Sequence, residues 1–161
     1  MHGRAVATKV SCRSPVARQR RSPEEPVTDD ATLEDISEAE CLELLASKSV
    51  GRVAVVSDGK PLIFPVNYVL DDRTVAFRTD PGTKLEAATL EGVAFEVDEV
   101  DYATREGWSV VVIGVGREVT DAWDPWSKRI TALPLEPWAA GDKSHWVAIA
   151  APRISGRRIR H

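Results

Sequence analysis

Alternating hydrophobic and polar positions indicate that most of the chain beyond residue 50 forms β-strands. The runs are rich in β-branched residues, whose side chains pack well on a pleated sheet. Short turn signals, an Asp-Gly pair at Asp58 and an Asp-Asp pair at Asp71, separate the first three runs, which cover residues 51–56, 61–70 and 73–79. Short turns join antiparallel neighbours, so this half of the chain excludes a doubly wound parallel sheet.

Three more segments have the composition of strands: residues 93–100, 107–119 and 145–150, and a further segment, 154–159, closes the chain. Glycines inside the longest of them are typical of strands that bend sharply, as at a barrel corner. The sequence therefore predicts a mainly β fold with short helices, a six-stranded antiparallel split β-barrel.

Helical periodicity appears in two short segments. Ser37 and Glu40 form a capping box ahead of an apolar face that ends near Gly51, which predicts a lid helix on the sheet. A second helix is expected over residues 83–90, ended by Gly92, and a third lies within an aromatic, proline-rich connection at residues 123–138.

Residues 1–33 lack periodicity, and we interpret them as a disordered basic tail ahead of one domain, residues 34–161. Six cations precede the first acid, Glu24, so the rest of the chain is acidic although the net charge is only −4. The tail also resembles an organellar transit peptide superficially; a disordered tail or an upstream start codon is the simpler interpretation. An acidic body argues against nucleic acid as the main partner, because phosphate neutralisation supplies most of that affinity.

Charged residues interrupt every apolar run before it reaches the length that spans a membrane, so we expect a soluble protein. Cys12 and Cys41 have no spacing typical of a metal site or of a disulfide framework, which favours a reducing, cytoplasmic location. The acidic run from Glu96 to Asp101 is explained by strand alternation and a solvated loop, and we predict no metal site.

A candidate phosphate site lies where the third strand ends. Arg78 offers a planar set of donors, Thr79 and Thr83 offer hydroxyls, and Lys84 falls in the first turn of a helix, where free N–H groups favour an anion. The alternative is an ordinary solvated turn beside two surface cations. Pro65 cannot donate to a ladder, so it predicts an edge, a bulge or a kink that leaves the backbone of residues 65–67 open to another partner.

Six segments, taken together and in this order, resemble the pyridoxamine 5′-phosphate oxidase-like family of FMN-binding split barrels, in its actinobacterial branch. They are Gly51-Arg52-Val53-Ala54, Phe64-Pro65-Val66-Asn67, Phe77-Arg78-Thr79 with Gly82-Thr83-Lys84-Leu85, Phe95-Glu96-Val97-Asp98, Gly107-Trp108-Ser109-Val110 and Ser155-Gly156-Arg157-Arg158. The resemblance begins near Ile36 and continues to the C-terminus.

The resemblance implies a homodimer with two flavin sites between the subunits. Arg78, Thr79, Thr83 and Lys84 would hold the flavin phosphate, and the segment Phe64, Pro65, Val66 and Asn67 would lie along the ring system. Trp108 and Ser109 would approach the cofactor, from the same or the partner subunit. It implies an FMN-dependent oxidoreductase acting on an unidentified small molecule.

The sequence leaves other cofactors and a non-catalytic function open. Relatives of this fold also bind a deazaflavin cofactor, whose acidic tail Arg157 and Arg158 could meet, or haem, for which His145 is the one candidate ligand in the barrel. A non-catalytic flavin-binding dimer, acting as a sensor or store, is a further alternative. The catalytic residues are unknown, since the sequence shows no convincing acid or base and His145 fits a structural role.

Overall fold

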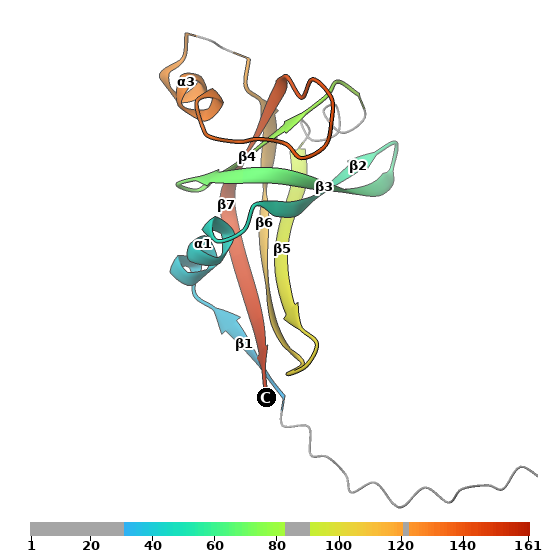
Figure 1. The fold of residues 1–161 in the computed structure, drawn as a ribbon, viewed down its shortest axis with the longest axis vertical. Helices are drawn as coiled ribbons and strands as arrows, with labels where there is room; N and C mark the ends of the chain where they lie inside the picture. The colour runs from blue at the N-terminus through green and yellow to red at the C-terminus, as the bar shows by residue number, and fades with distance from the viewer. Residues whose placement is uncertain (1–30, 83–90, 121–122) are drawn as a thin grey trace, which may run out of the picture.

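Seven antiparallel strands form the protein's single sheet in this computed structural model, which describes residues 31–82, 91–120 and 123–161 (Figure 1). The strands follow the order β1-β7-β4-β3-β2-β5-β6, and β6 also pairs with β7. Their bounds are β1 Thr32–Ile36, β2 Val50–Ser57, β3 Lys60–Asp71, β4 Thr74–Thr79, β5 Glu91–Asp101, β6 Glu106–Glu118 and β7 His145–Arg160.

The pairing of β6 with β7 closes strands β2 to β7 into a ring, so the predicted six-stranded antiparallel barrel is confirmed. Its interior is filled by side chains with no exposed surface, among them Val53, Phe77, Phe95, Val110 and Ile149. These alternate with outward-facing residues along each strand, as a barrel requires.

The first hairpin has the predicted Asp-Gly turn. Asp58 and Gly59 both have positive φ angles, 51° and 71°, and this twist suits a two-residue connection between antiparallel strands. The turn fixes the register of β2 against β3 from Ser57 paired with Lys60 to Val50 paired with Asn67.

The last strand differs from the prediction, because the two expected segments, residues 145–150 and 154–159, are parts of one 16-residue strand, β7. Pro152 lies between these two segments, and proline cannot donate to a ladder. It lies at a register shift opposite Gly114, where β6 pairs Ile113 with Arg153 and Val115 with Ala150. A Cβ built at Gly114 would lie 1.9 Å from Ala150 O, so the close approach at this bulge requires glycine.

Strand β1 was not expected, and it begins inside the segment assigned to the tail. Thr32 and Leu33 pair with Arg160 and Ile159 at the end of β7. Four of the five residues of β1 are exposed, so its sequence lacks the alternation of hydrophobic and polar residues that marks a half-buried strand. The other residues assigned to the tail, 1–30, lie outside the described residues, as does the expected helix at 83–90.

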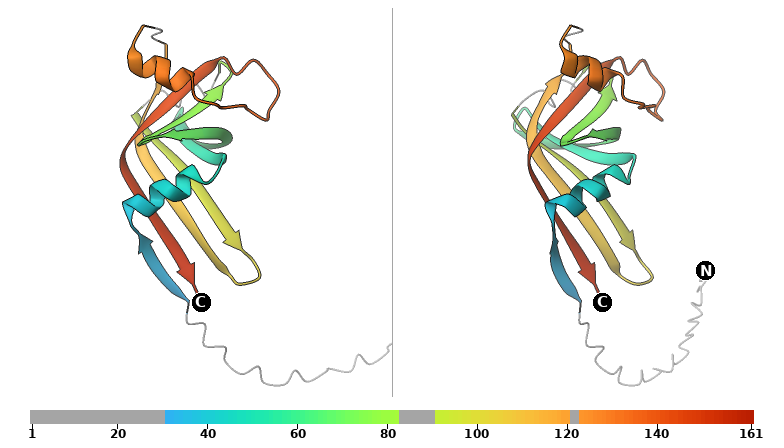
Figure 2. Two further views of the ribbon diagram at one scale, coloured as in Figure 1. Left: turned by 60° about the vertical axis from the view of Figure 1, so that its left-hand side comes forward. Right: turned by 90° about the vertical axis from the view of Figure 1, so that its left-hand side faces the viewer.

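Helix α1, Glu38–Ala46, begins as its capping box predicts, with Ser37 Oγ accepting a hydrogen bond from Glu40 N at 3.3 Å. It lies beside β7 along the side of the barrel (Figure 2) and buries Cys41 and Leu45. The short helix α3, Pro125–Thr131, begins at Asp124, whose carboxylate accepts from Ser127 N at 2.8 Å. Helix α3 buries Ser127 and Ile130.

Candidate functional site

Strands β3 and β4 separate at one point, and the first group of predicted site residues lies there. β3 pairs with β4 only from Tyr68, opposite Phe77, to Asp71, while its earlier half pairs with β2 alone among the described strands. Pro65 therefore stands on an edge, as its missing N–H predicts. Asn67 comes one residue before the last β3–β4 pair, and Arg78 one residue after it on the other strand, so the two flank the split.

Arg78 is held by contacts within the chain. Its Nε donates to the backbone carbonyl of Lys143 at 2.8 Å, and its guanidinium lies 5.6 Å from the ring centroid of Trp146, its cross-strand partner on β7. A guanidinium fixed by one hydrogen bond and an aromatic face presents its terminal nitrogens in a defined direction. Thr79, the next residue, is 3% exposed, and its hydroxyl donates to Asp80 O at 3.2 Å.

A connection that we call the strap, residues 132–144 between α3 and β7, crosses this split (Figure 1). Near its middle, Trp138 N donates to Asn67 Oδ1 at 2.8 Å, while Asn67 Nδ2 donates to Ser49 O at 3.4 Å. At its end, Lys143 N donates to Asp80 Oδ1 at 2.8 Å, and Lys143 Nζ forms an ion pair with the same carboxylate. The strap is therefore fastened to both strands that flank the split.

The structure thus brings Asn67, Arg78 and Thr79 together at one end of the barrel, with Phe64, Pro65 and Val66 along the β3 edge that leads to them. Val66 is buried, 6% exposed, and Phe64 packs against the core, so the outward face of this edge belongs to Pro65 and Asn67. Thr83 and Lys84, the other predicted phosphate contacts, lie outside the described residues.

Trp108 and Ser109 lie elsewhere. They lie near the start of β6 and pair with Arg158 and Arg157 near the end of β7, whereas Arg78 pairs with Trp146 at the start of β7. Arg157 and Arg158 come eleven and twelve residues after Trp146, a length along β7 of up to about 40 Å at about 3.3 Å per residue. Within one chain, the two groups therefore lie near opposite ends of β7.

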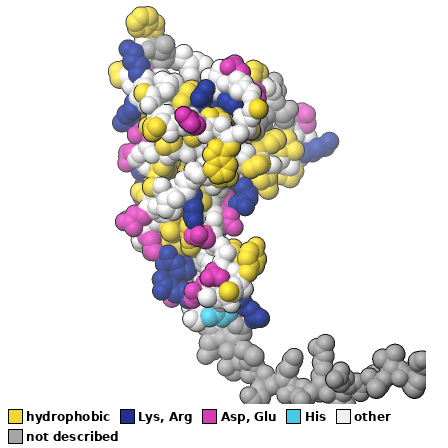
Figure 3. Space-filling view, viewed as in Figure 1, with side chains coloured by type: hydrophobic (Ala, Val, Ile, Leu, Met, Phe, Trp, Pro, Cys, Tyr) yellow, Lys and Arg dark blue, Asp and Glu magenta, His cyan; other side chains and the backbone are white. Residues whose placement is uncertain are grey.

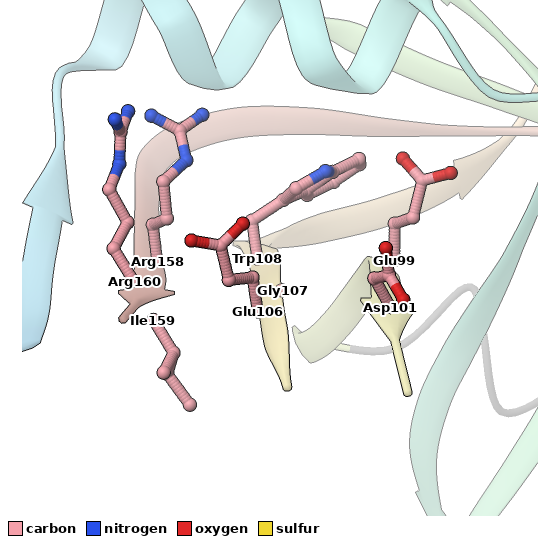
Figure 4. Close-up of a pocket in the computed structure, with 8 residues that line it drawn as sticks. All are labelled: Glu99, Asp101, Glu106, Gly107, Trp108, Arg158, Ile159 and Arg160. Atoms are coloured by element: carbon pink, nitrogen blue, oxygen red, sulfur yellow. The ribbon is translucent and has the colours of Figure 1, made fainter. Parts of the chain in front are cut away.

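A cavity of about 330 Å³ opens beside Trp108 (Figure 4). Arg158 and Arg160 lie on one side of the indole and Glu99 and Asp101 on the other. Lys48 Nζ lies 5.6 Å from the ring centroid and 2.9 Å from Glu99 Oε2, and this cation lowers the pKa of Glu99. The cavity combines an aromatic face with charges of both signs, which suits a polar, planar ligand.

On the outer face of the sheet, a cavity of about 430 Å³ has Trp108 and Ser109 in its wall. Arg52 beside it donates to Glu96 at 3.0 Å and to Asp98 at 2.5 Å, so the acidic run is paired across strands. Burial raises the pKa of Glu96, and the charge of Asp98 adds to this effect, while Arg52 opposes it. Among the described residues, no group of three His, Cys, Asp or Glu side chains could hold a metal ion.

His145 is the cross-strand partner of Thr79, so it lies at the same end of the barrel as Arg78. Its Nδ1 is 2.6 Å from Glu118 Oε1, and both side chains are about one third exposed. This pairing joins β7 to the end of β6, which agrees with a structural role for the histidine.

The sequence did not reveal the strap's contribution. Lys143 and Trp138 are more than 60 residues from the strand residues they contact, and loop contacts follow no periodic pattern. The signal that could have found them is composition: Gly141 and Trp138 in an irregular segment indicate a connection that packs closely against the sheet.

The closed antiparallel ring with a split between β3 and β4 defines the class of this protein as a split β-barrel. The chain belongs to the pyridoxamine 5′-phosphate oxidase-like family, because the family profile described as pyridoxamine 5′-phosphate oxidase matches residues 37–158. This confirms the family that the six sequence segments indicated.

Three relatives show how similar family members are. An uncharacterized protein of Mycobacterium tuberculosis is 34% identical over 131 residues, covering 78% of this chain and 84% of that protein. A Mycobacterium smegmatis structure described as an FAD binding protein is 36% identical, covers 80% of this chain and 100% of that chain, and has a TM-score of 0.60. A Corynebacterium glutamicum structure, described provisionally as a pyridoxamine 5′-phosphate oxidase, is 34% identical, covers 81% and 100%, and has a TM-score of 0.69.

Neither α1 nor α3, nor any other helix within the described ranges, is long and apolar enough to cross a membrane.

Proposed function

We propose that this protein binds a flavin, FMN, and acts as an oxidoreductase on a small molecule. The observation that carries this proposal is the position of Arg78 at the β3–β4 split, where Arg78 and Asn67 each lie one residue beyond the Tyr68–Phe77 pair, in a family whose M. smegmatis relative is described as an FAD binding protein. When bound, the flavin supplies the redox chemistry, accepting electrons at its ring and passing them on.

The residues at the split fit the phosphate end of such a cofactor. With its Nε bonded to Lys143 O, Arg78 keeps four N–H donors on its terminal nitrogens, the geometry that matches a phosphate. The hydroxyl of Thr79 donates to Asp80 O and its side chain is 3% exposed, so Thr79 supports the end of β4 beside Arg78; Thr83 and Lys84 are the further predicted contacts. Asn67 has both ends of its amide bonded, to Trp138 N and Ser49 O, so the edge from Phe64 to Asn67 would offer the ring a fixed surface.

Completion of the site requires a second copy of the chain, and we propose a homodimer. Trp108 and Ser109 are up to about 40 Å from Arg78 along β7, so they could reach a cofactor held at Arg78 only from a partner subunit. The two cavities beside Trp108 would then lie at the ring end, where a small substrate would bind.

The outer face of the sheet offers the surface for such a dimer. Ile63, Ala54, Ala94 and Ile113 are aligned in one row across β3, β2, β5 and β6. Ile63 is 66% exposed and Ile113 42%, and Figure 3 shows hydrophobic side chains gathered over the β2–β3 hairpin. An exposed apolar row of this kind marks a protein interface.

A non-catalytic flavin-binding dimer is the second candidate. The observation that favours it is the pairing of the titratable groups around Arg78, Asp80 with Lys143 and His145 with Glu118. A flavin that is reduced in the protein but passes electrons to none of a panel of acceptors would support this function over an oxidoreductase.

Binding titrations of FMN, FAD and the deazaflavin cofactor, followed by fluorescence and visible absorption, test the proposal. Tightest binding of FMN with quenching of its emission is expected. Tighter binding of FAD or of the deazaflavin than of FMN would assign that molecule as the cofactor instead. No binding of any of the three would refute the proposed function.

A further inference from the structure

Lys143, near the end of the strap, contacts Arg78 and Asp80, the two residues on either side of Thr79 in the sequence. Its N–H donates to Asp80 Oδ1 at 2.8 Å, its carbonyl accepts from Arg78 Nε at 2.8 Å, and its ammonium pairs with Asp80. One residue of the strap thus fixes the end of β4 from both sides of its buried threonine.

The backbone of Lys143 is in a conformation that lysine rarely adopts. Its φ is +43°, in the left-handed region, where a side chain beyond glycine is disfavoured. Such conformations persist only where the surroundings hold them, and they occur preferentially at functional sites. Here the Asp80 carboxylate holds both nitrogens of Lys143, and the same conformation directs the Lys143 carbonyl to Arg78.

The surroundings leave this arrangement little freedom. The Lys143 side chain is 16% exposed. Gly141, with a φ of +126°, allows the strap to approach so closely that a Cβ there would lie 2.9 Å from Lys143 Nζ and 3.0 Å from Asp80 Oδ2. Trp146 stands behind the Arg78 guanidinium, with a ring centroid 5.6 Å away.

We propose that Lys143 is a positioning residue, whose carbonyl and clasp with Asp80 orient Arg78 toward the phosphate of the flavin. This inference rests on the proposed function and adds to it the element that prepares the phosphate end. A hydrogen bond to Nε and an aromatic plane together fix the guanidinium, so less rotamer freedom is lost when it binds an anion. The ammonium of Lys143 forms an ion pair with Asp80, and we do not propose that it contacts the phosphate.

Substitutions at Lys143 separate the backbone role from the side-chain charge. Lys143→Gly keeps the N–H, the carbonyl and access to positive φ, whereas Lys143→Pro removes the N–H and fixes φ near −65°. Asp80→Ala, which removes both acceptors of the clasp, is the second variant if the proline variant does not fold. Circular dichroism and a thermal melt identify variants that fold.

The readout is the pair of dissociation constants for FMN and riboflavin, which differ only by the phosphate. For Lys143→Pro and Asp80→Ala we expect FMN affinity to fall about tenfold or more, the size of one lost charge-assisted contact. Riboflavin affinity should change by less than about threefold, and Lys143→Gly should stay within about threefold of the wild type for both ligands, because it retains the backbone geometry.

A second set of measurements in the Arg78→Ala background tests whether Lys143 acts through Arg78. There, Lys143→Pro should cause no further loss of FMN affinity, since coupled residues are not additive. Equal losses of FMN and riboflavin, unchanged FMN affinity, or the same loss in both backgrounds would each overturn the inference. Wild-type protein that binds neither ligand would instead refute the proposed function, which is a different result.

Discussion

Arg78 shows how one side chain can be predicted while its environment cannot. Its type and its place at the end of an alternating run indicated an anion site, and the structure adds the Lys143 carbonyl and the Trp146 ring that fix its orientation. Those partners are 65 and 68 residues away, so no local pattern contains them. The donor group is therefore visible in the sequence at this position, whereas the contacts that orient it come from the fold.

Replacing Lys84, a predicted phosphate contact, tests the same site from the other side of the turn. Lys84→Ala should cost about 1.5–3 kcal/mol of FMN binding free energy, because a charge-assisted contact is lost. Isothermal titration calorimetry with FMN measures this cost. Lys128→Ala, at an exposed lysine of α3, is the matched control and should leave the affinity unchanged; equal effects of the two variants would assign Lys84 to an ordinary turn.

Gly51 on β2 tests the close packing of the core. A Cβ there would lie 2.2 Å from Phe95 Cζ and 2.9 Å from Glu96 O, one neighbour being backbone that cannot move aside. We expect Gly51→Ala to destabilise the protein by about 1–3 kcal/mol, as overpacked cores do. Urea denaturation measures the change, with Ser57→Ala at the end of the same strand as the control; an unchanged midpoint would mean that β2 can shift.

Among the elements, strands with one buried face were the ones that the sequence predicted. The β2–β3–β4 meander and β5 and β6 follow from alternation and turn chemistry, as the Asp58-Gly59 turn shows. Strand β1 was missed because its side chains are mostly exposed and its register comes from β7, with Glu34–Arg160 and Asp35–Arg157 ion pairs at 3.5 and 3.6 Å. The continuity of β7 was missed because Pro152 is tolerated at a bulge that only the partner strand β6 creates.

The turn between β5 and β6 should make stability depend on acid. Asp101 Oδ1 accepts from Ala103 N at 2.8 Å and Thr104 N at 3.3 Å, and these bonds lower the pKa of Asp101 below its ordinary value of 3.8. A group whose pKa is lowered by folding stabilises the protein above its unfolded pKa, and this stabilisation is lost as the pH falls through the folded value.

Asp101→Asn isolates that contribution. The variant should unfold at lower urea than the wild type at pH 7, and the difference should shrink as the pH falls below 3.8, the ordinary pKa of the carboxyl, toward its lower folded value. Denaturation midpoints at pH 7 and pH 3 measure it. A difference of the same size at both pH values would show that the carboxylate charge does not stabilise the turn.

At the scale of the whole molecule, the two groups of predicted cofactor contacts lie far apart within one chain. Arg78 and Thr79 lie at the start of β7, and Trp108 and Ser109 near its end. A symmetric dimer could place each group beside the other group from the partner, so dimerisation and cofactor binding should be lost together.

Ile63→Asp tests that coupling on the exposed apolar row of the outer sheet face. A carboxylate in a buried apolar interface is costly, so the variant should be monomeric by light scattering at concentrations where the wild type is dimeric. It should also lose FMN affinity, although Ile63 is not among the predicted cofactor contacts. Trp123→Ser, at an 86% exposed residue near α3, is the control that should leave both properties intact. A dimeric Ile63→Asp variant would place the interface elsewhere.

The most direct test of the account is the visible spectrum of the full-length protein titrated with FMN. We expect saturable binding with flavin absorption near a ratio of one cofactor per chain, quenched fluorescence, and clear weakening on replacement of Arg78 by alanine. Absence of saturable binding, or binding that Arg78→Ala leaves unchanged, would contradict the assignment of the β3–β4 split as a flavin site.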